Sequence, residues 1–254
     1  MLSFLIMADL TLIESCIFAF GVILAFAVRS GAGFGGGVVA VPVLALAAPL
    51  PTVVPVSSML NIISGLQQGV RDWRLVEWRE MKRLLPWAWV GVLIGIWMLA
   101  KVDPKPLSRA FGLFIIAYAI YMLYMGGRAP RVPQRWLNLV AAVASFFGGF
   151  IGSIFGGAAG PVFAIYLQSI HVEKNQFRAT MTMLMLILAG TRAVGFVVAG
   201  MYTPKVLTLL AWSIPLVFVG GYLGTRVVQR LDQRRFGIGV ACVLFASGAI
   251  LVLR

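Results

Sequence analysis

Two stretches of this sequence decide its fold: FGGGVVAVPVLAL at residues 34–46 and FGGAAGPVFAIYL at residues 155–167. Each begins with glycines and continues as a short apolar run with a proline near its start, which is Pro42 in the run 36–50 and Pro161 in the run 157–170. These runs correspond to about 21–23 Å of helix, whereas the hydrocarbon core of a bilayer is about 30 Å thick. Irregular backbone at membrane depth is tolerated only inside protein or beside a wet cavity. We therefore expect two short broken helices inside a helix bundle.

The composition of the whole chain indicates a membrane protein. Of its 254 residues, 61% are hydrophobic and 11% are charged, and the mean hydropathy is +0.97, far from the values of a soluble domain. A spanning helix needs about 20 mostly apolar residues. The sequence thus predicts an all-α polytopic membrane protein, in which the long apolar runs are 8–29, 54–70, 83–101, 105–125, 136–156, 176–200, 206–229 and 234–253.

The distribution of basic residues predicts how often the chain crosses the membrane. The net charge is +13, but the basic residues cluster between apolar runs and lack interleaved aromatic residues, which argues against nucleic acid as a partner. If both short runs cross, one side carries 15 basic residues, with Arg29 among them, and the other side five. If both runs are re-entrant, this asymmetry almost vanishes. We therefore favour ten crossings, with both termini outside the cytoplasm.

The two halves of the chain resemble each other. Besides the glycine-rich stretches, PWAWVGVLIG at 86–95 aligns with PLVFVGGYLG at 215–224. Residues 1–127 and 128–254 would then each hold five helices, and an odd number inserts the second copy upside down relative to the first. Paired broken helices in an inverted repeat are typical of transporters and point to a substrate site near the bilayer midplane.

The glycine-rich breaks are candidate anion-binding positions. A helix start presents free N–H groups and the positive end of the helix dipole, and glycine lets an anion approach the backbone closely. The alternative is that these glycines only allow close helix packing. The residues concerned are Gly35, Gly36 and Gly37 in the first half and Gly156 and Gly157 in the second.

Arg192 is the strongest single candidate for binding an anion. It lies in the middle of the apolar run LMLILAGTRAVGFVVAG, and no acidic residue occurs between Glu173 and Asp232. A central Arg costs about 2.5–3.5 kcal/mol on insertion scales, so it should face the protein interior. A bound anion is one partner that would neutralise it, and carbonyl groups at a helix end are the other.

The first half offers a polar stripe at the corresponding place. Within VPVSSMLNIISGLQQGV at 54–70, the residues Ser57, Asn61, Ser64 and Gln68 share one helical face. Such a stripe should face a cavity, where Ser57, Asn61 and Gln68 would contact substrate, or a neighbouring helix that it holds by hydrogen bonds.

Other kinds of chemistry find little support in the sequence. His171 is the only histidine, so we expect no metal site, no cofactor and no histidine-based catalysis. Paired acids and a nucleophile–histidine pairing are also missing, which argues against an intramembrane enzyme. Glu14 is the one acid inside an apolar run, so no relay of buried carboxylates is visible.

With these motifs the chain resembles the sulfite exporter TauE/SafE family of membrane anion transporters. The resemblance lies in GAGFGGGVVAVPVLAL with the following VPVSSMLNIISGLQQGVRDWRLVEW, and in GGFIGSIFGGAAGPVFAIYL with FRATMTMLMLILAGTRAVGF. The G-T-S that is usual in the family appears as VSS at 56–58. The resemblance implies movement of small sulfur-containing oxyanions, such as sulfite, sulfonates or sulfoacetate, across a bacterial inner membrane.

We therefore expect a secondary transporter that exports such anions by alternating access. Uptake in place of export, a carboxylate substrate, and a structural or assembly subunit are the alternatives. The expected partners are a small anionic substrate and membrane lipid, and the sequence leaves a homodimer open.

Overall fold

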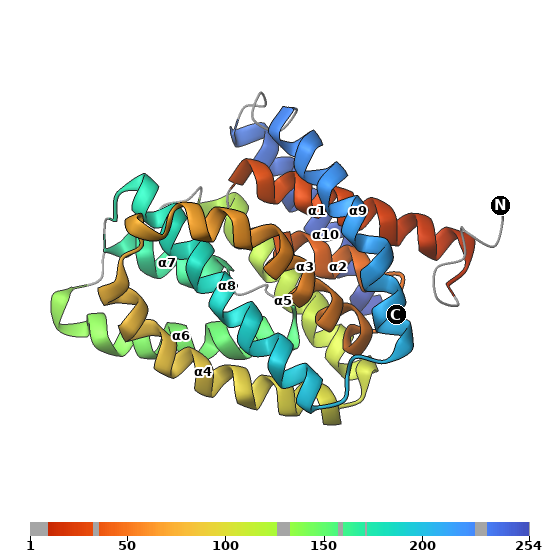
Figure 1. Ribbon diagram of the computed structural model, residues 1–254, viewed down its shortest axis with the longest axis horizontal. Coiled ribbons are helices and arrows are strands. Elements are labelled where there is room, and N and C mark those ends of the chain that lie inside the picture. The colour runs from red at the N-terminus through yellow and green to blue at the C-terminus, as the bar shows by residue number, and fades with distance from the viewer. Residues whose placement is uncertain are drawn as a thin grey trace.

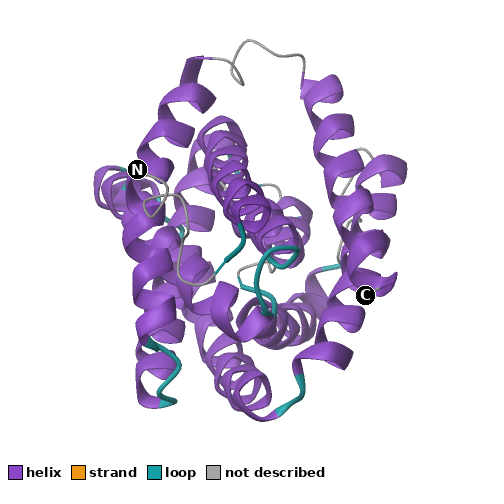
Figure 2. Cartoon of the chain, turned by 90° about the vertical axis from the view of Figure 1, so that its right-hand side faces the viewer, coloured by secondary structure: helices purple, strands orange, loops and turns teal. Residues whose placement is uncertain are grey.

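The computed structural model describes residues 10–32, 36–125, 133–156, 160–170, 172–226 and 233–253. Every regular element in these residues is a helix (Figure 2), which confirms the predicted all-α class. The long and short α-helices are α1 (Leu12–Ala32), α2 (Gly36–Leu44), α3 (Leu50–Arg71), α4 (Trp78–Lys101), α5 (Pro104–Met125), α6 (Leu137–Ile154), α7 (Gly160–Ser169), α8 (Lys174–Val198), α9 (Pro204–Arg226) and α10 (Gln233–Leu253), with 3₁₀ turns at Trp73–Leu75 and Gln134–Trp136.

Several of these helices have the length and composition of membrane spans. In the described part of the chain, five helices meet both criteria, in α1, α4, α6, α8 and α9, and α10 contains a shorter apolar helix. The 22 residues of α3 would reach about 33 Å, which is enough to span, and its Ser, Asn and Gln residues lower its hydropathy. The protein is therefore a polytopic all-α membrane protein.

The first short helix is shorter than the sequence predicted. The predicted run 36–50 is helical only from Gly36 to Leu44, and α3 begins at Leu50 rather than at residue 54. Pro51 falls in the first turn of α3, where a missing N–H group removes no intrahelical hydrogen bond. In the second half α7 lies within the predicted 157–170, and residues 157–159 are outside the described residues.

Helices α3 and α8 form an antiparallel pair at the centre of the molecule (Figure 1). At one end Arg178 Nη2 lies 3.7 Å from Asp72 Oδ2. In the middle the Arg192 Nε group donates to Ser58 Oγ at 3.4 Å. At the other end the Tyr202 hydroxyl donates to the Pro55 carbonyl at 3.4 Å. The pair thus runs through the bundle from one face to the other.

The remaining helices pack around this pair in corresponding contacts. Helix α4 packs on α6, and α9 packs on α1. Likewise α8 packs on α4 and α3 on α9, while α5 packs on α10. If α1–α5 exchange places with α6–α10 in order, so that α1 becomes α6 and α6 becomes α1, the same set of contacts results. Figure 1 shows α4 beside α6 at one end of the molecule and α1 beside α9 at the other.

Glycines in corresponding positions allow two of these close contacts. A Cβ atom added to Gly91 in α4 would collide with the Phe146 carbonyl oxygen of α6. One added to Gly220 in α9 would lie 2.6 Å from the Ile23 carbonyl oxygen of α1. Small residues that let helix backbones approach are the usual means of helix association in a membrane, where lipid tails already solvate apolar side chains.

We expect Gly91→Ala to destabilise the protein by about 1–3 kcal/mol, because the α6 backbone must move to accept the methyl group. Gly239→Ala is the matched control, since no atom lies within 4 Å of the added Cβ, and it should be neutral or stabilising by about 0.5–1 kcal/mol. Thermal unfolding of the purified protein in detergent measures both effects. An unchanged unfolding temperature for Gly91→Ala would contradict the packing of α4 on α6.

Candidate functional site

Arg192 lies at the centre of the α3–α8 pair and is completely enclosed. Its side chain is 1% exposed, and its Nε group donates to Ser58 Oγ at 3.4 Å. Among the residues that the structure describes, Arg192 Nη1 has no hydrogen-bond partner. A buried N–H group of a charged side chain is costly when it has no hydrogen-bond acceptor. A bound ligand would supply the acceptor that this nitrogen lacks.

Tyr202 lies close to Arg192, in the connection between α8 and α9. Burial raises the pKa of Tyr202 to about 12, and the nearby Arg192 charge acts in the opposite direction. The phenol is therefore neutral at physiological pH. Because its hydroxyl donates to the Pro55 carbonyl, Tyr202 joins the start of α9 to the first turns of α3 beside Arg192.

The polar stripe of α3 faces the protein interior, as its spacing predicted. Ser57 and Asn61 are buried and Ser64 is half-buried, whereas the side chain of Gln68 lies outside the described residues. The Asn61 Nδ2 group donates to the Ser57 carbonyl at 2.8 Å. Ser58, which sequence reasoning did not single out, is the α3 residue that contacts Arg192. Among the described residues, the side chains that interact with Arg192 are those of Ser58 and Tyr202, which makes its surroundings there polar but uncharged.

Arg29 of α1 is a second buried arginine, and it contacts the polar stripe of α3. Its place at the end of the apolar run 8–29 led us to count it with the basic residues of one membrane side and not to single it out for the site, whereas α1 continues to Ala32 and Arg29 is only 6% exposed. Its Nη1 group donates to Asn61 Oδ1 at 2.7 Å. The apolar run before Arg29 continues into small residues, and this extension is the signal that could have placed it inside the helix.

One of the two glycine-rich breaks contacts the α3 stripe. Gly156 has a φ of +62°, a conformation that favours glycine, and its carbonyl oxygen accepts a hydrogen bond from Ser57 Oγ at 3.3 Å. Its neighbour Phe155 stacks on Phe111 of α5 with ring centroids 4.5 Å apart. The end of α6 is thereby held against α3 and α5.

The other predicted glycines can be placed only in part. Gly36 and Gly37 form the first turn of α2, where the backbone N–H groups have no intrahelical acceptor. Gly37 is buried. Gly35 and Gly157 lie outside the described residues.

A second polar cluster joins α4 to the short helix α7. The Tyr166 hydroxyl donates to Glu80 Oε2 at 2.6 Å, and Arg83 Nη1 donates to both oxygens of the same carboxylate at 3.0 Å. Nearby, the Glu77 backbone N–H group donates to Thr180 Oγ1 at 2.9 Å. Together with Asp72 and its Arg178 neighbour, these contacts hold one end of the α3–α8 pair to α4 and α7.

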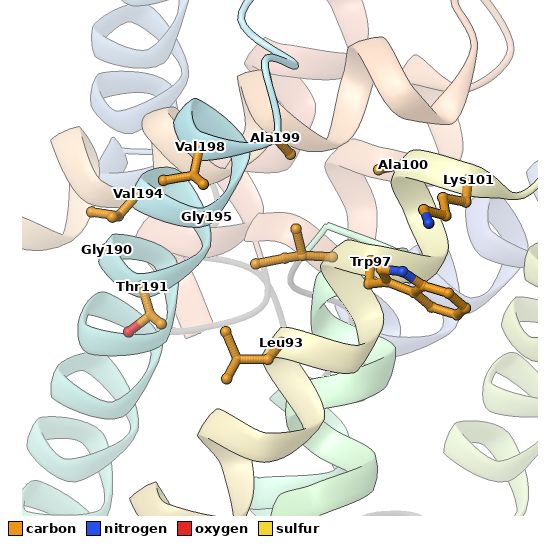
Figure 3. Close-up of a pocket in the computed structure, with 11 residues that line it drawn as sticks. Leu93, Trp97, Ala100, Lys101, Gly190, Thr191, Val194, Gly195, Val198 and Ala199 are labelled. Atoms are coloured by element: carbon orange, nitrogen blue, oxygen red, sulfur yellow. The ribbon is translucent and has the colours of Figure 1, made fainter.

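A groove of about 910 Å³ lies between α4 and α8, away from the polar face of α3. Figure 3 shows Trp97 and Lys101 of α4 opposite Thr191 and Val194 of α8. The lining is almost entirely apolar, and Lys101 at the end of α4 is its one charged residue. Such a lining suits hydrocarbon and does not suit a small oxyanion, so the groove is not the candidate anion site.

Comparison with known proteins assigns the chain to a family. The sequence profile described as Sulfite exporter TauE/SafE matches residues 17–251. The chain belongs to this family. It is 26% identical over 197 residues to "Probable inner membrane transporter protein TsaS" of Comamonas testosteroni, covering 76% of this chain and 80% of the relative. It is also 22% identical over 213 residues to a "Probable membrane transporter protein" of Haemophilus influenzae, covering 77% and 78%. No solved structure matches.

Membership of the TauE/SafE family makes the protein a membrane transporter, and the family is not one of enzymes. Within the described ranges, no group of three or more His, Cys, Asp or Glu side chains could hold a metal ion. The chemistry that this TauE/SafE protein offers at its centre is therefore that of buried guanidinium, hydroxyl and amide groups.

The contact of Gly156 with Ser57 predicts a larger effect of a methyl group there than at another glycine of the same conformation. Gly200 also has a positive φ, +68°, but no atom lies within 4 Å of an added Cβ. Gly200→Ala should thus cost about 1–2 kcal/mol, from backbone strain alone. Gly156→Ala should cost about 1–3 kcal/mol more, because the new Cβ would lie 2.5 Å from Val41 Cγ2 of α2 and 2.7 Å from Ser57 Oγ of α3.

Thermal unfolding of the two variants in detergent tests this difference. The double variant Gly156→Ala/Ser57→Ala should recover part of the loss, since it removes the hydroxyl oxygen and leaves the backbone strain. An equal decrease in unfolding temperature for Gly156→Ala and Gly200→Ala would show that Gly156 is not closely packed against its neighbours.

Proposed function

We propose that this TauE/SafE transporter moves small sulfur-containing oxyanions, such as sulfite, sulfonates or sulfoacetate, by alternating access around Arg192, in the direction of export. The observation that carries the proposal is the fully buried Nη1 group of Arg192, which has no partner among the described residues. Of the two partners that sequence reasoning left open, an anion and helix-end carbonyls, this unpartnered nitrogen favours the anion.

The side chains around Arg192 match the chemistry of a small oxyanion. A guanidinium is permanently charged and presents N–H groups in a planar fork that fits two oxygens of an oxyanion. Ser58 adds a hydroxyl group that accepts from Arg192 Nε and can donate to a third oxygen. The neighbouring Ser57 hydroxyl donates to backbone carbonyl groups in this conformation, and its oxygen adds to the polar lining. Uncharged surroundings leave the Arg192 charge to be neutralised by the substrate, which gives the site selectivity for anions over neutral solutes.

Alternating access also needs two parts that can move against each other. We assign these to residues 1–127 and 128–254, inserted in opposite orientations across the inner membrane with ten crossings and periplasmic termini. This division is supported by the matching helix contacts of the two halves, such as α4 on α6 and α9 on α1. The central position of α3 and α8, one from each half, supports it as well. The word "inner membrane" in the name of the TsaS relative supports the location. In such transporters the substrate site lies where the repeats meet.

We expect Arg192→Ala to lower the initial rate of sulfite and sulfoacetate flux in proteoliposomes by about 10- to 150-fold, the range for losing a hydrogen bond to a charged group. Arg109→Ala is the matched control, because Arg109 is exposed near the start of α5, and its flux should equal that of wild type. Substrate loaded inside or outside oriented vesicles separates export from uptake.

Two results would count against this site. Unchanged flux in Arg192→Ala would remove Arg192 from the transport path. An absence of flux for sulfite, sulfonates and carboxylates alike in the wild type would favour a structural or assembly role.

The proposed orientation predicts which positions share a side of the membrane. Because Asp72 meets Arg178 at one end of the α3–α8 pair, cysteines at positions 74 and 175 should react with an impermeant maleimide from the cytoplasmic side. Cysteines at Thr52 and Thr203, at the opposite end, should react from the periplasmic side. Labelling intact cells and inverted vesicles gives the two accessibilities.

The background for this experiment needs one precaution. Both native cysteines, Cys16 and Cys242, are exposed and must first be replaced by serine. Labelling of all four introduced cysteines from one side would overturn the orientation and with it the inverted repeat.

A further inference from the structure

The groove between α4 and α8 lies on the apolar outer surface of the helix bundle. Its floor is the contact between the two helices, where a Cβ atom added to Gly195 would collide with Ile96 Cδ1. Its lining includes Trp97 and Val194, whose side chains are 61% and 66% exposed. On a membrane-spanning bundle, exposed apolar side chains of this kind contact lipid. The groove is therefore a hollow on the lipid-facing surface.

The length of the groove matches one leaflet of a bilayer. Its lining runs from Leu93 to Lys101 on α4 and from Gly190 to Ala199 on α8, so both walls are formed where these helices end. At 1.5 Å per residue, the walls are about 12–14 Å long. One leaflet supplies half of a hydrocarbon core about 30 Å thick. A spanning helix of a second copy would need a contact across the whole core, whereas a lipid acyl chain ends near the bilayer centre.

The wall on α8 offers apolar contacts along its length. The Thr191 hydroxyl in this wall already donates to the Ile187 carbonyl at 3.0 Å. One turn from the groove floor, Gly190 leaves the wall open, because no atom lies within 4 Å of a Cβ added there. A hydrocarbon chain gives up no hydrogen bond in such a lining, and it gains contacts by filling the open space.

Lys101 places a positive charge at the end of the groove that is level with the ends of both helices. Its Nζ atom lies 5.1 Å from the centre of the Trp97 ring (Figure 3). It takes part in none of the ion pairs that the described residues form. Trp and Lys side chains near the end of a spanning helix lie at the level of the lipid head groups. A lipid phosphate at that level would supply the negative charge that Lys101 lacks.

We infer that the groove binds one phospholipid from the leaflet at the Tyr202 end, with an acyl chain between α4 and α8 and the phosphate on Lys101. Phosphatidylglycerol suits a single lysine better than phosphatidylcholine does, because its head group carries no cation of its own. Since α4 belongs to the first half of the chain and α8 to the second, the bound lipid contacts both halves. The inference does not depend on which solute is transported.

Native mass spectrometry of the full-length protein in detergent tests this inference. In a titration of wild type with phosphatidylglycerol, the first lipid should bind more tightly than any further one. It should also bind about fivefold more tightly than the first phosphatidylcholine, as expected for one lysine near the membrane surface. Binding of this lipid should raise the unfolding temperature of the protein, which gives an independent measurement.

A glycine variant assigns the acyl chain to the groove. Gly190→Leu places a side chain in the open wall, and it should lower the affinity for the first phosphatidylglycerol by about 5- to 150-fold, the range for overfilling a packed space. Gly239→Leu on α10 is the matched control, because a Cβ added there also meets no atom within 4 Å. This control should bind phosphatidylglycerol like wild type.

A lysine variant assigns the phosphate. Lys101→Gln should bind phosphatidylglycerol and phosphatidylcholine equally, because it removes the charge and keeps the chain-binding walls. Lys82→Gln is the matched control, since Lys82 is an exposed lysine at the opposite end of the same helix, and it should keep the preference of wild type.

Three results would contradict the inference. Equal affinity of wild type for the two lipids would overturn the contact of the phosphate with Lys101, and this comparison needs no variant to fold. Unchanged lipid binding in Gly190→Leu would overturn the groove as the site. A lipid-free dimer of wild type that Gly190→Leu converts to a monomer would show that a second copy occupies the groove. No transported anion enters these measurements, so they stand or fail separately from the proposed function.

Discussion

The burial of Arg192 without a counter-charge is the constraint on which the centre of this protein depends. A permanently charged group inside an apolar bundle needs polar neighbours from several helices, and α3 supplies them. In the antiparallel register of α3 and α8, the Ser58 hydroxyl of α3 meets Arg192 of α8. That register also brings Asp72 to Arg178 at one end and Pro55 to Tyr202 at the other. The polar neighbour of Arg192 and the contacts at both ends of the α3–α8 pair thus occur together in one arrangement of the two helices.

Much of the fold could be predicted because membrane helices follow from composition and length. The spacing of Ser57 and Asn61 gave the buried face of α3, and the isolated charge in α8 gave Arg192. Helix ends were less predictable. The apolar run after Gly36 continues beyond Leu44, but the chain turns there, and Pro51 starts α3 early. Hydropathy does not distinguish a buried turn from a buried helix, because both are apolar inside a bundle.

The part of the site that sequence reasoning missed depends on contacts between distant segments. Arg29 ends the predicted apolar run 8–29 and was counted only by its side of the membrane, and only the contact between α1 and α3 shows that Asn61 accepts its hydrogen bond. The helical spacing singled out Ser57 and not Ser58, because spacing alone does not show which of two adjacent hydroxyls faces α8. Both residues were visible as residue types, and what was missing was the relative rotation of the helices.

The contacts at the two ends of the α3–α8 pair differ in kind, and this bears on how the proposed site would open. At the end beyond Arg178 the pair is joined by the charged contact of Arg178 with Asp72, and Glu80, held by Tyr166 and Arg83, joins α4 to α7 beside it. At the other end the contact is one long, neutral hydrogen bond from Tyr202. Charge-assisted bonds are roughly twice as strong as neutral ones, so the Tyr202 end is the easier one to separate. Release of an anion from Arg192 toward the Tyr202 end would disturb no ion pair of the described residues.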